Sequence, residues 1–471
     1  MHGDFSRLTF RPDKHYRGVV AQQGRVQLDA DANEQVAIDD YLLRTIVTDL
    51  VGPHAGPSGD PAAPGAPGFA IGYDTAGKLP DLVIGPGRYY VAGMLCDATA
   101  PEPMAPVNED GQALEVVPPG DYRYFSQPDL FPDPTEDADK LPKPPFLVYL
   151  QVTERLVTAL EDEDLAEPAL GALRPDTTAR LKVCWQVRAL PADHLGKQPR
   201  DVSADELRIA FDGWAADRAS FGRLAARTTP STDTDPCVLA PDSQYRGPEN
   251  QLYRVQVHRS GAAADAGVAD PATFVWSREN GSVAFAVAAV AGELVTLAAP
   301  GRDGTLELEV GDWVEALDDV SVAAGGGAPL LQVLGVDVAD RQVRLSGAPA
   351  LAAPATGYHP RLRRWDQQAG GTGAPRLVDG ALELTENRWL DLEDGIQVCF
   401  VGPGGYIGGD YWVIPARSAG GSLLWPENAA RMPLAQRRLG PETVYAPLAW
   451  IRADGQVLDL RSAFAFLGLP L

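Results

Sequence analysis

Residues 273–287, TFVWSRENGSVAFAV, are the most informative stretch of this sequence for its fold class. β-Branched and aromatic residues are concentrated on both sides of Asn280-Gly281, a dipeptide that tolerates the positive φ angles of a tight turn. The pattern predicts a β-hairpin with strands over 273–279 and 282–287. A strand-rich architecture is therefore the first expectation.

On both sides of this stretch, short apolar runs with turn residues between them continue the β pattern. Segments 306–316, 330–336 and 342–345 surround a Gly-rich loop and predict a small SH3-like barrel. Segments 146–153 and 182–188 are rich in β-branched and aromatic residues and predict strands. The sequence thus predicts a mainly β fold of several small β-sandwich or barrel domains.

The first fifty residues have a different character. An extended arm over 4–10 and an extended segment over 16–28 precede a predicted amphipathic helix. Asp31 and Glu34 have capping-box spacing, and Gly52-Pro53 ends the helix. Its apolar stripe consists of Val36, Leu43, Ile46, Val47 and Leu50. This stripe must be covered by the rest of the protein or by a partner.

The composition predicts five segments. Residues 1–52 form an arm and helix for docking, and 53–68 form a Gly/Pro linker. Residues 69–250 form a first β-rich domain with a helical or irregular excursion near 203–228. Residues 251–350 form a β domain with the SH3-like barrel, and 351–471 form a C-terminal β-rich region.

Charge and hydropathy exclude several classes of partner. The 471 residues carry 40 basic and 64 acidic side chains, a net charge of −24 that disfavours binding to nucleic acid or anionic membranes. A stretch of about 18 consecutive apolar residues, as a membrane span requires, does not occur in the sequence. The N-terminal residues do not resemble a Sec signal, so we expect synthesis in the cytoplasm.

Metal and catalytic motifs are incomplete in the sequence. Cys96, Cys184, Cys237 and Cys399 are far apart and are expected to be buried thiols. The six histidines are scattered singly. Asp29 to Asn33 imitate the start of a calcium loop, but Glu34 and Asp40 replace the Gly and Glu that this loop requires. We therefore expect no metal, no cofactor and no enzymatic activity.

Two observations keep an enzyme or lectin open as the alternative. Abundant carboxylates leave room for a pair that flanks a glycosidic bond. Four tryptophans, Trp365, Trp389, Trp412 and Trp425, are candidates for a sugar-stacking ladder. The acidic run Glu161 to Asp164 is expected to be solvated. The alternative function is a cell-envelope polysaccharide-binding protein or glycoside hydrolase.

Six segments carry a resemblance to a known group of proteins. They are GDFSR (3–7), QQGRVQLDADANEQ (22–35), IGPGRYYV (84–91), VTALED (157–162), FVWSRENG (274–281) and GDYWVIPAR (409–417). They resemble an uncharacterised bacterial domain family associated with extracellular contractile injection systems, which are phage-tail-like particles. The resemblance spans nearly the whole chain. Ala32 departs from it, since Trp is common at this position, so a contact made by that ring would be missing.

The resemblance implies a structural, non-enzymatic subunit at the baseplate or tail tip of such a particle. The implied partners are other subunits of the particle, including copies of this chain in a symmetric homo-oligomer, and the particle is either cytoplasmic or released. Phe5, Leu8 and Phe10 are expected to be buried on a partner, while Arg25 and the segment Asp29 to Glu34 fix the turn between arm and helix. The interface candidates are Phe5, Leu8, Phe10, Tyr16, Arg25, Leu28, Asp29, Asp31, Glu34, Leu43 and Val47.

Overall fold

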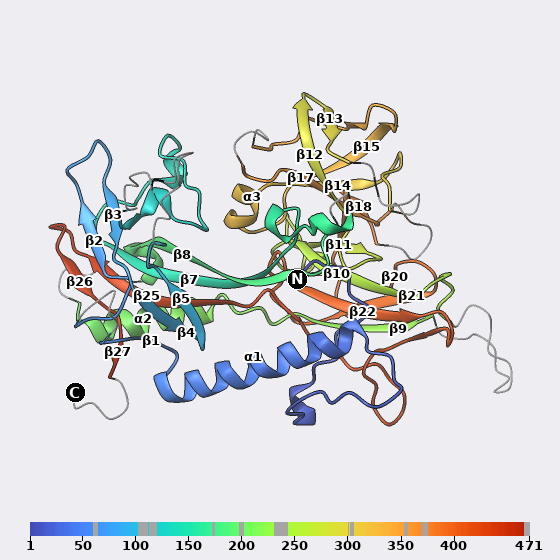
Figure 1. Cartoon of the computed structure of the whole chain (residues 1–471), viewed down its shortest axis with the longest axis horizontal. Coiled ribbons are helices and arrows are strands. Elements are labelled where there is room, and N and C mark those ends of the chain that lie inside the picture. Colours follow the sequence, from blue (N-terminus) through green and yellow to red (C-terminus); the bar gives the residue numbers. More distant parts are fainter. Residues whose placement is uncertain are drawn as a thin grey trace. The chain divides into compact units, whose positions relative to one another are not determined.

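A computed structural model describes residues 1–59, 65–101, 112, 120–171, 175–196, 202–229, 244–299, 301, 306–352, 357–368, 370 and 375–465. The fold is mainly β, as the sequence predicts (Figure 1). The chain forms two compact units, each assembled from three separate stretches. The first unit contains 1–36, 155–182 and 220–441, and the second contains 37–154, 183–219 and 442–471.

In the first unit, strands β10, β11 and β22 lie at the centre of a six-stranded sheet with the order β18-β19-β11-β10-β22-β23. The bounds are β10 (Gln251–Arg259), β11 (Thr273–Ser277), β18 (Leu377–Val378), β19 (Ala381–Glu383), β22 (Tyr411–Arg417) and β23 (Ser422–Leu423). A four-stranded sheet packs on its inner face, with β9 (Arg223–Thr228), β20 (Leu390–Asp391), β21 (Ile396–Val401) and β24 (Gln436–Arg437). Phe274, Phe400 and Trp412 are buried between the two sheets.

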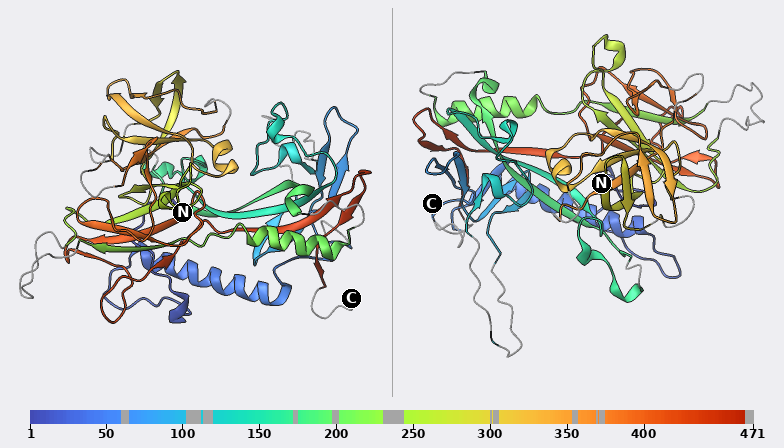
Figure 2. Two further views of the ribbon diagram at one scale, coloured as in Figure 1. Left: turned by 180° about the vertical axis from the view of Figure 1, so that it is seen from behind. Right: turned by 90° about the horizontal axis from the view of Figure 1, so that it is seen from above.

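A closed six-stranded barrel stands where the sequence predicts an SH3-like barrel (yellow to orange in Figure 2). Its strands are β12 (Ala284–Ala291), β13 (Leu294–Leu297), β14 (Trp313–Leu317), β15 (Leu330–Asp337), β16 (Gln342–Leu345) and β17 (Arg361–Trp365). Val295, Val314 and Leu362 are among its fully buried residues. Helix α3 (Asp319–Ala324) follows β14. Because β17 closes the barrel, the barrel extends past the predicted boundary at residue 350.

The described part of the second unit contains three further sheets. One has β1 (His54–Pro57), β4 (Arg88–Val91), β5 (Met94–Asp97) and β27 (Ala463–Phe464), and another has β2 (Ile71–Asp74), β3 (Asp81–Ile84) and β6 (Tyr122–Arg123). The third contains β7 (Phe146–Val157), β8 (Arg180–Pro191), β25 (Thr443–Ile451) and β26 (Val457–Asp459). The end of β7 and the start of β8 belong to the first unit. Helix α2 (Ala204–Ala216) buries Leu207, Phe211 and Trp214 in an apolar cluster with residues of β7 and β25.

The described residues also form short 3-10 helices. They are η1 (Pro12–Lys14), η2 (Tyr124–Ser126), η3 (Asp137–Asp139), η4 (Glu163–Leu165), η5 (Pro168–Leu170), η6 (Ala192–Leu195) and η8 (Ala264–Ala266). Cys96, Cys184 and Cys399 are buried, as expected, whereas Cys237 lies outside the described residues.

The hairpin that the sequence predicts at Asn280-Gly281 does not form, because β11 and β12 do not pair with each other. Both residues do adopt positive φ, at 52° and 65°. However, β11 pairs with β10 and β19, whereas β12 pairs with β13 and β17. The turn therefore sends the chain from the six-stranded sheet into the barrel, because the partners of each strand come from distant parts of the sequence.

Helix α1 (Asp29–Val51) confirms the predicted N-terminal helix but not its capping. The helix begins before Asp31, whose carboxylate accepts a hydrogen bond from the Leu28 amide at 3.1 Å. Glu34 accepts instead from the Thr9 hydroxyl, in the arm. Gly52, with φ 91°, follows the last helical residue.

The predicted linker and domain ranges also differ from the structure. Residues 54–57 of the expected linker form β1, which pairs with β4 and β27, and 60–64 lie outside the described residues. Each compact unit is discontinuous in sequence, because it is built from three stretches that are far apart in the chain. Composition shows where turns are frequent, but it does not show which strands pair.

Candidate interaction site

The outer face of the six-stranded sheet binds the N-terminal arm, which in the structure comprises residues 1–10, and we call this face the seat. Along β10, Tyr253 and Val255 point into the core between the sheets, while Leu252 and Arg254 belong to the opposite face. Tyr411 and Val413 of β22 lie beside them on this opposite face. An outer face with these apolar residues requires a cover.

The arm provides the apolar part of this cover. Phe5 and Leu8 pack against the cluster of Leu252, Tyr411 and Val413. Gly3 is buried in a tight position, since a Cβ there would lie 2.7 Å from Leu156 Cδ2. Two of the three apolar side chains that were expected to be buried on a partner, Phe5 and Leu8, are thus half-buried on their own chain.

Arg254 is the polar centre of the seat. Its guanidinium stacks 3.6 Å from the centre of the Tyr411 ring. Its Nη1 donates to the Met1 carbonyl at 2.9 Å and to Asn280 Oδ1 at 3.1 Å, and its Nε donates to Gln256 Oε1 at 2.8 Å. Burial lowers the pKa of Arg254 to about 9. The arm backbone therefore satisfies a donor that would be costly to leave unpaired.

Asn280 and Gly281 hold the first residues of the arm. Asn280 Nδ2 donates to the Gly3 carbonyl at 2.9 Å. A glycine is required at position 281 for a second reason besides its positive φ, because a Cβ there would lie 2.7 Å from the His2 ring. The turn that the sequence marks as a hairpin thus has a different role, which is to receive the arm.

His2 contributes a titratable group to the seat. Its Nε2 donates to Gln256 Oε1 at 2.8 Å. Burial, followed by the positive charges of Arg254 and Arg363, holds the pKa of His2 well below its usual range. The seat thus accepts a neutral imidazole.

The start of α1 fixes the far end of the arm. Asp29 accepts a hydrogen bond from the Ser6 amide at 2.8 Å, and Glu34 accepts from Thr9 Oγ1 at 2.5 Å. Arg417 Nη2 donates to the Ser6 carbonyl at 2.8 Å. The acidic helix start therefore binds the arm.

The segment between arm and helix, residues 16–28, is exposed, and we call it the tip. Its turn has Gly24 at φ 71° and a hydrogen bond from the Arg25 amide to the Gln22 carbonyl. Val20 and Val26, on the two sides of this turn, are 85% and 84% exposed. Exposure of both valines means that nothing in the described part of the chain covers the turn.

One face of α1 is exposed as well, and we call it the stripe. It comprises Val36, Leu43, Ile46 and Leu50, which are 54%, 61%, 55% and 68% exposed. Their spacing of seven, three and four residues places them in one seam along the helix. The opposite face contains Ala30 and Ile38, which are buried. Within the described residues, the stripe is left uncovered.

The predicted interface residues therefore separate into three groups. Phe5 and Leu8 lie in the seat, and Phe10 is half-buried. Asp29, Asp31 and Glu34 bind the arm or the helix start. The exposed members are Tyr16, Arg25, Leu28 and Leu43, whereas Val47 is half-buried. Arg25 shapes the tip turn through its backbone amide.

The sequence matches the family described as "Family of unknown function (DUF6519)" over residues 1–229 and 215–442. The chain belongs to this family. The arm, its seat, the tip and the stripe all lie within the matched residues of this DUF6519 chain. No curated protein and no solved structure matches it.

Arg254 and Gln256 are central to the seat but are not among the residues predicted from the sequence. The segments 3–7, 274–281 and 409–417, which carry part of the resemblance, are far apart in the sequence, and the structure brings parts of all three together. The alternation along 253–257 is the signal for Arg254 and Gln256 in the sequence. Both residues alternate with three apolar residues of the core, so they lie on the opposite face of the strand.

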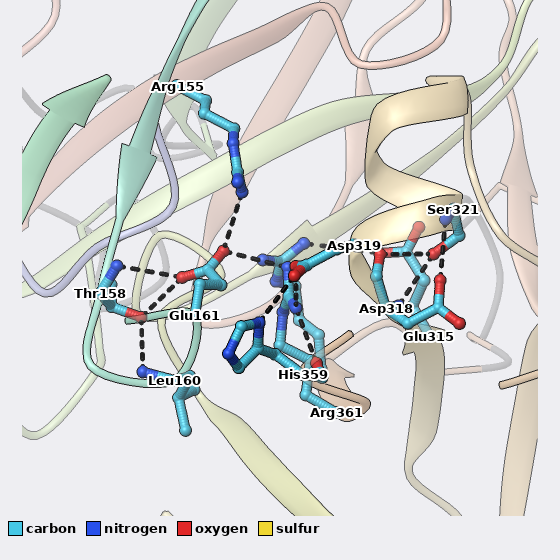
Figure 3. Close-up of polar contacts among 11 residues, drawn as sticks. Arg155, Thr158, Leu160, Glu161, Glu315, Asp318, Asp319, Ser321, His359 and Arg361 are labelled. Atoms are coloured by element: carbon cyan, nitrogen blue, oxygen red, sulfur yellow. Dashed lines mark hydrogen bonds and ion pairs between the residues drawn. The ribbon is translucent and has the colours of Figure 1, made fainter. Parts of the chain in front are cut away.

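A second polar cluster attaches residues 155–162 to the barrel (Figure 3). Glu161 accepts from Arg361 Nη2 at 3.0 Å and from the Thr158 amide, also at 3.0 Å. Asp319 Oδ2 lies 2.6 Å from His359 Nδ1. Burial opposes ionisation of Glu161, but Arg361 and the Thr158 bonds leave its pKa lowered. The prediction that Glu161 is solvated is wrong, since the backbone folds it onto the buried Arg361.

A small cavity of about 180 Å³ lies beside Trp276, Leu382 and Leu392. Arg278 donates to both carboxylate oxygens of Glu393 at 2.6 Å and to Asp366 at 3.0 Å. These charged groups of the lining are thus already paired with one another. This arrangement is typical of a structural ion-pair network.

The four tryptophans that are candidates for a sugar-stacking ladder do not form one on the surface of the described chain. Trp365 and Trp412 are buried in apolar clusters, and Trp425 is half-buried against the sandwich core. Trp389 is covered by the Arg227 guanidinium at 3.9 Å. Among the described residues, no group of three His, Cys, Asp or Glu side chains is placed to hold a metal ion. No helix in the described ranges is long and apolar enough to cross a membrane.

Proposed function

We propose that the protein is a structural subunit of a contractile injection system or related phage-tail-like particle, at the baseplate or tail tip. It acts by assembly, and its N-terminal region attaches it to a neighbouring subunit. The resemblance in the sequence suggests the particle, and the exposed surfaces of the N-terminal region support the mode of action.

The observation that carries this proposal is the exposure of the tip and the stripe. Folded monomers rarely leave large apolar patches in water, and contiguous ones usually mark an interaction surface. Val20, Val26, Leu43 and Leu50 are all more than half exposed. Their burial on a neighbour would contribute on the order of several kcal/mol before the entropic cost of association.

The contacts of the arm refine the proposal. Because Phe5 and Leu8 already pack on the chain's own sheet, the arm acts as a clamp that holds the N-terminal region on the first unit. The clamp fixes where the tip begins, since Ser6 and Thr9 are bound to the start of α1. A positioned tip loses less entropy on binding than a free chain.

The test is incorporation into particles. The gene would be deleted in the producing bacterium and replaced by wild type, by Val20→Asp with Val26→Asp, or by the control Ile209→Asp, whose site on α2 is also highly exposed. Particles would be purified and the amount of this chain measured by mass spectrometry. We expect normal occupancy for wild type and the control, and loss for the tip variant. Absence of the wild-type chain from purified particles would refute the proposal.

A further inference from the structure

The tip and the stripe are complementary in charge. Both are apolar and exposed, so each needs a cover. Their charges are opposite, and both surfaces belong to one chain. The sign of the flanking charges therefore indicates what covers each of them.

The tip is basic. Between residues 16 and 28 it contains Arg17 and Arg25 and no acidic residue. Both arginines are exposed, as are Val20 and Val26 on the two sides of the turn. The Val19 amide donates to Gln35 Oε1 at 2.7 Å, which fixes one side of the tip to the first part of α1. The tip is thus a positioned apolar turn with positive charge.

The stripe is acidic. Helix α1 contains six acidic residues and one basic residue, Arg44. Arg44 is half-buried and pairs with Glu442 at 2.7 Å and Asp40 at 3.6 Å, so its charge is neutralised. Helical spacing places Asp39 within the stripe and the exposed Asp49 beside it. An occupant of this seam therefore meets a net negative charge.

Pairing of like surfaces is unfavourable. Two stripes face to face would bring Asp39 and Asp49 near the same residues of the other copy, and two tips would bring arginines together. A tip on a stripe instead joins apolar side chains and opposite charges. Both surfaces are exposed in the described part of the chain.

We propose that the tip of one copy binds the stripe of a second copy. The inference rests on the proposed function, because it identifies the neighbouring subunit as another copy of this chain. The contact uses two different patches, and such a head-to-tail interface continues until it closes into a ring or extends as a filament. It also predicts salt sensitivity, since the charges at its rim are exposed.

Cross-linking tests the geometry. Val26→Cys and Leu43→Cys would be made separately in the full chain, and a short bis-maleimide reagent would be added to each and to their mixture. We expect dimers in the mixture and none from either variant alone. The unmodified chain gives the background from its own cysteines. Dimers of Leu43→Cys alone would overturn the proposal in favour of paired stripes.

Charge reversal tests the chemistry. Sedimentation velocity over a concentration series would compare wild type with Arg25→Glu, Asp49→Lys and an equal mixture of the two. We expect each reversal to weaken self-association about tenfold, and the mixture to recover it, because the reversed tip then meets a reversed stripe of opposite charge. Arg344→Glu, at an exposed barrel position, is the control with the same change in net charge as Arg25→Glu.

A wild-type chain that stays monomeric and does not cross-link in any combination would overturn this inference. The stripe and tip would then belong to an interface with a different protein. The proposed function would remain intact if particles still contain the chain and lose it with the tip variant. Failure of the inference and failure of the proposed function are therefore distinguishable.

Discussion

Arg254 shows how one buried cation holds the arm. Its donors reach Met1 and Asn280, and its guanidinium stacks on Tyr411. Arg254→Met keeps an apolar stem on the ring but removes the donors. We expect the unfolding free energy to fall by about 1–3 kcal/mol, because Asn280 and the Met1 carbonyl lose a charged partner. Urea denaturation would measure the change.

Hydrogen exchange of residues 1–10 would separate this effect from a general loss of stability. Arg344→Met, in an exposed barrel position, is the matched control and should leave exchange unchanged. If Arg254→Met retains wild-type protection of the arm, Arg254 is not the centre of the seat.

The lowered pKa of His2 predicts that the binding of the arm to the seat depends on pH. The pKa of His2 is lowered in the folded state. Below pH 6.5, the usual pKa of histidine, the unfolded chain therefore binds a proton at His2 more readily than the folded chain does. The contribution of His2 to stability is therefore present above pH 6.5 and is lost as the pH falls below it. In the wild type, we expect the protection of the arm amides against hydrogen exchange to decrease as the pH falls below 6.5. In His2→Gln, this protection should depend less on pH.

At the level of structural elements, the arm packs on the outer face of the six-stranded sheet and is expected to stabilise it. Deleting residues 1–10 uncovers the cluster of Leu252, Tyr411 and Val413. Loss of two half-buried apolar side chains predicts a decrease of about 2–4 kcal/mol in unfolding free energy. Val20→Ser with Val26→Ser, in the exposed tip, should leave the melting temperature of the monomer unchanged. An unchanged melting temperature after the deletion would show that the arm does not stabilise the sheet.

The segment after β7 is attached to the barrel by a buried ion pair. Glu161→Gln leaves Arg361 without its closest carboxylate, and removal of one partner of a buried pair costs about 3–5 kcal/mol. Glu163→Gln changes an exposed carboxylate in the same acidic run and should be nearly neutral. Thermal unfolding of both variants would show whether stability depends on the ion pair with Arg361 or only on the number of carboxylates in this run.

For the molecule as a whole, we expect chelators to leave stability unchanged. Among the described residues, no three possible ligands converge, and the calcium-like run at Asp29 binds the arm and the helix start. A decrease of about ten degrees in melting temperature with EDTA would reveal a metal site that these residues do not show.

Local preferences in the sequence were sufficient to predict the mainly β composition, the N-terminal helix and the positive φ of Asn280-Gly281. These features depend on neighbours in the chain, such as β-branched side chains in strands and glycine in turns. The barrel strands over 313–317, 330–337 and 342–345 were also predictable, since short apolar runs alternated with turn residues.

Strand pairing and the cover of each surface depend on the tertiary structure. The pairing of β11 with β10 and β19 joins segments far apart in the chain, and no local preference specifies that choice. The same holds for the apolar stripe, for which the sequence required a cover without identifying it. Because burial depends on contacts between distant residues, the structure alone shows that the arm is covered by its own sheet while the tip and stripe stay exposed.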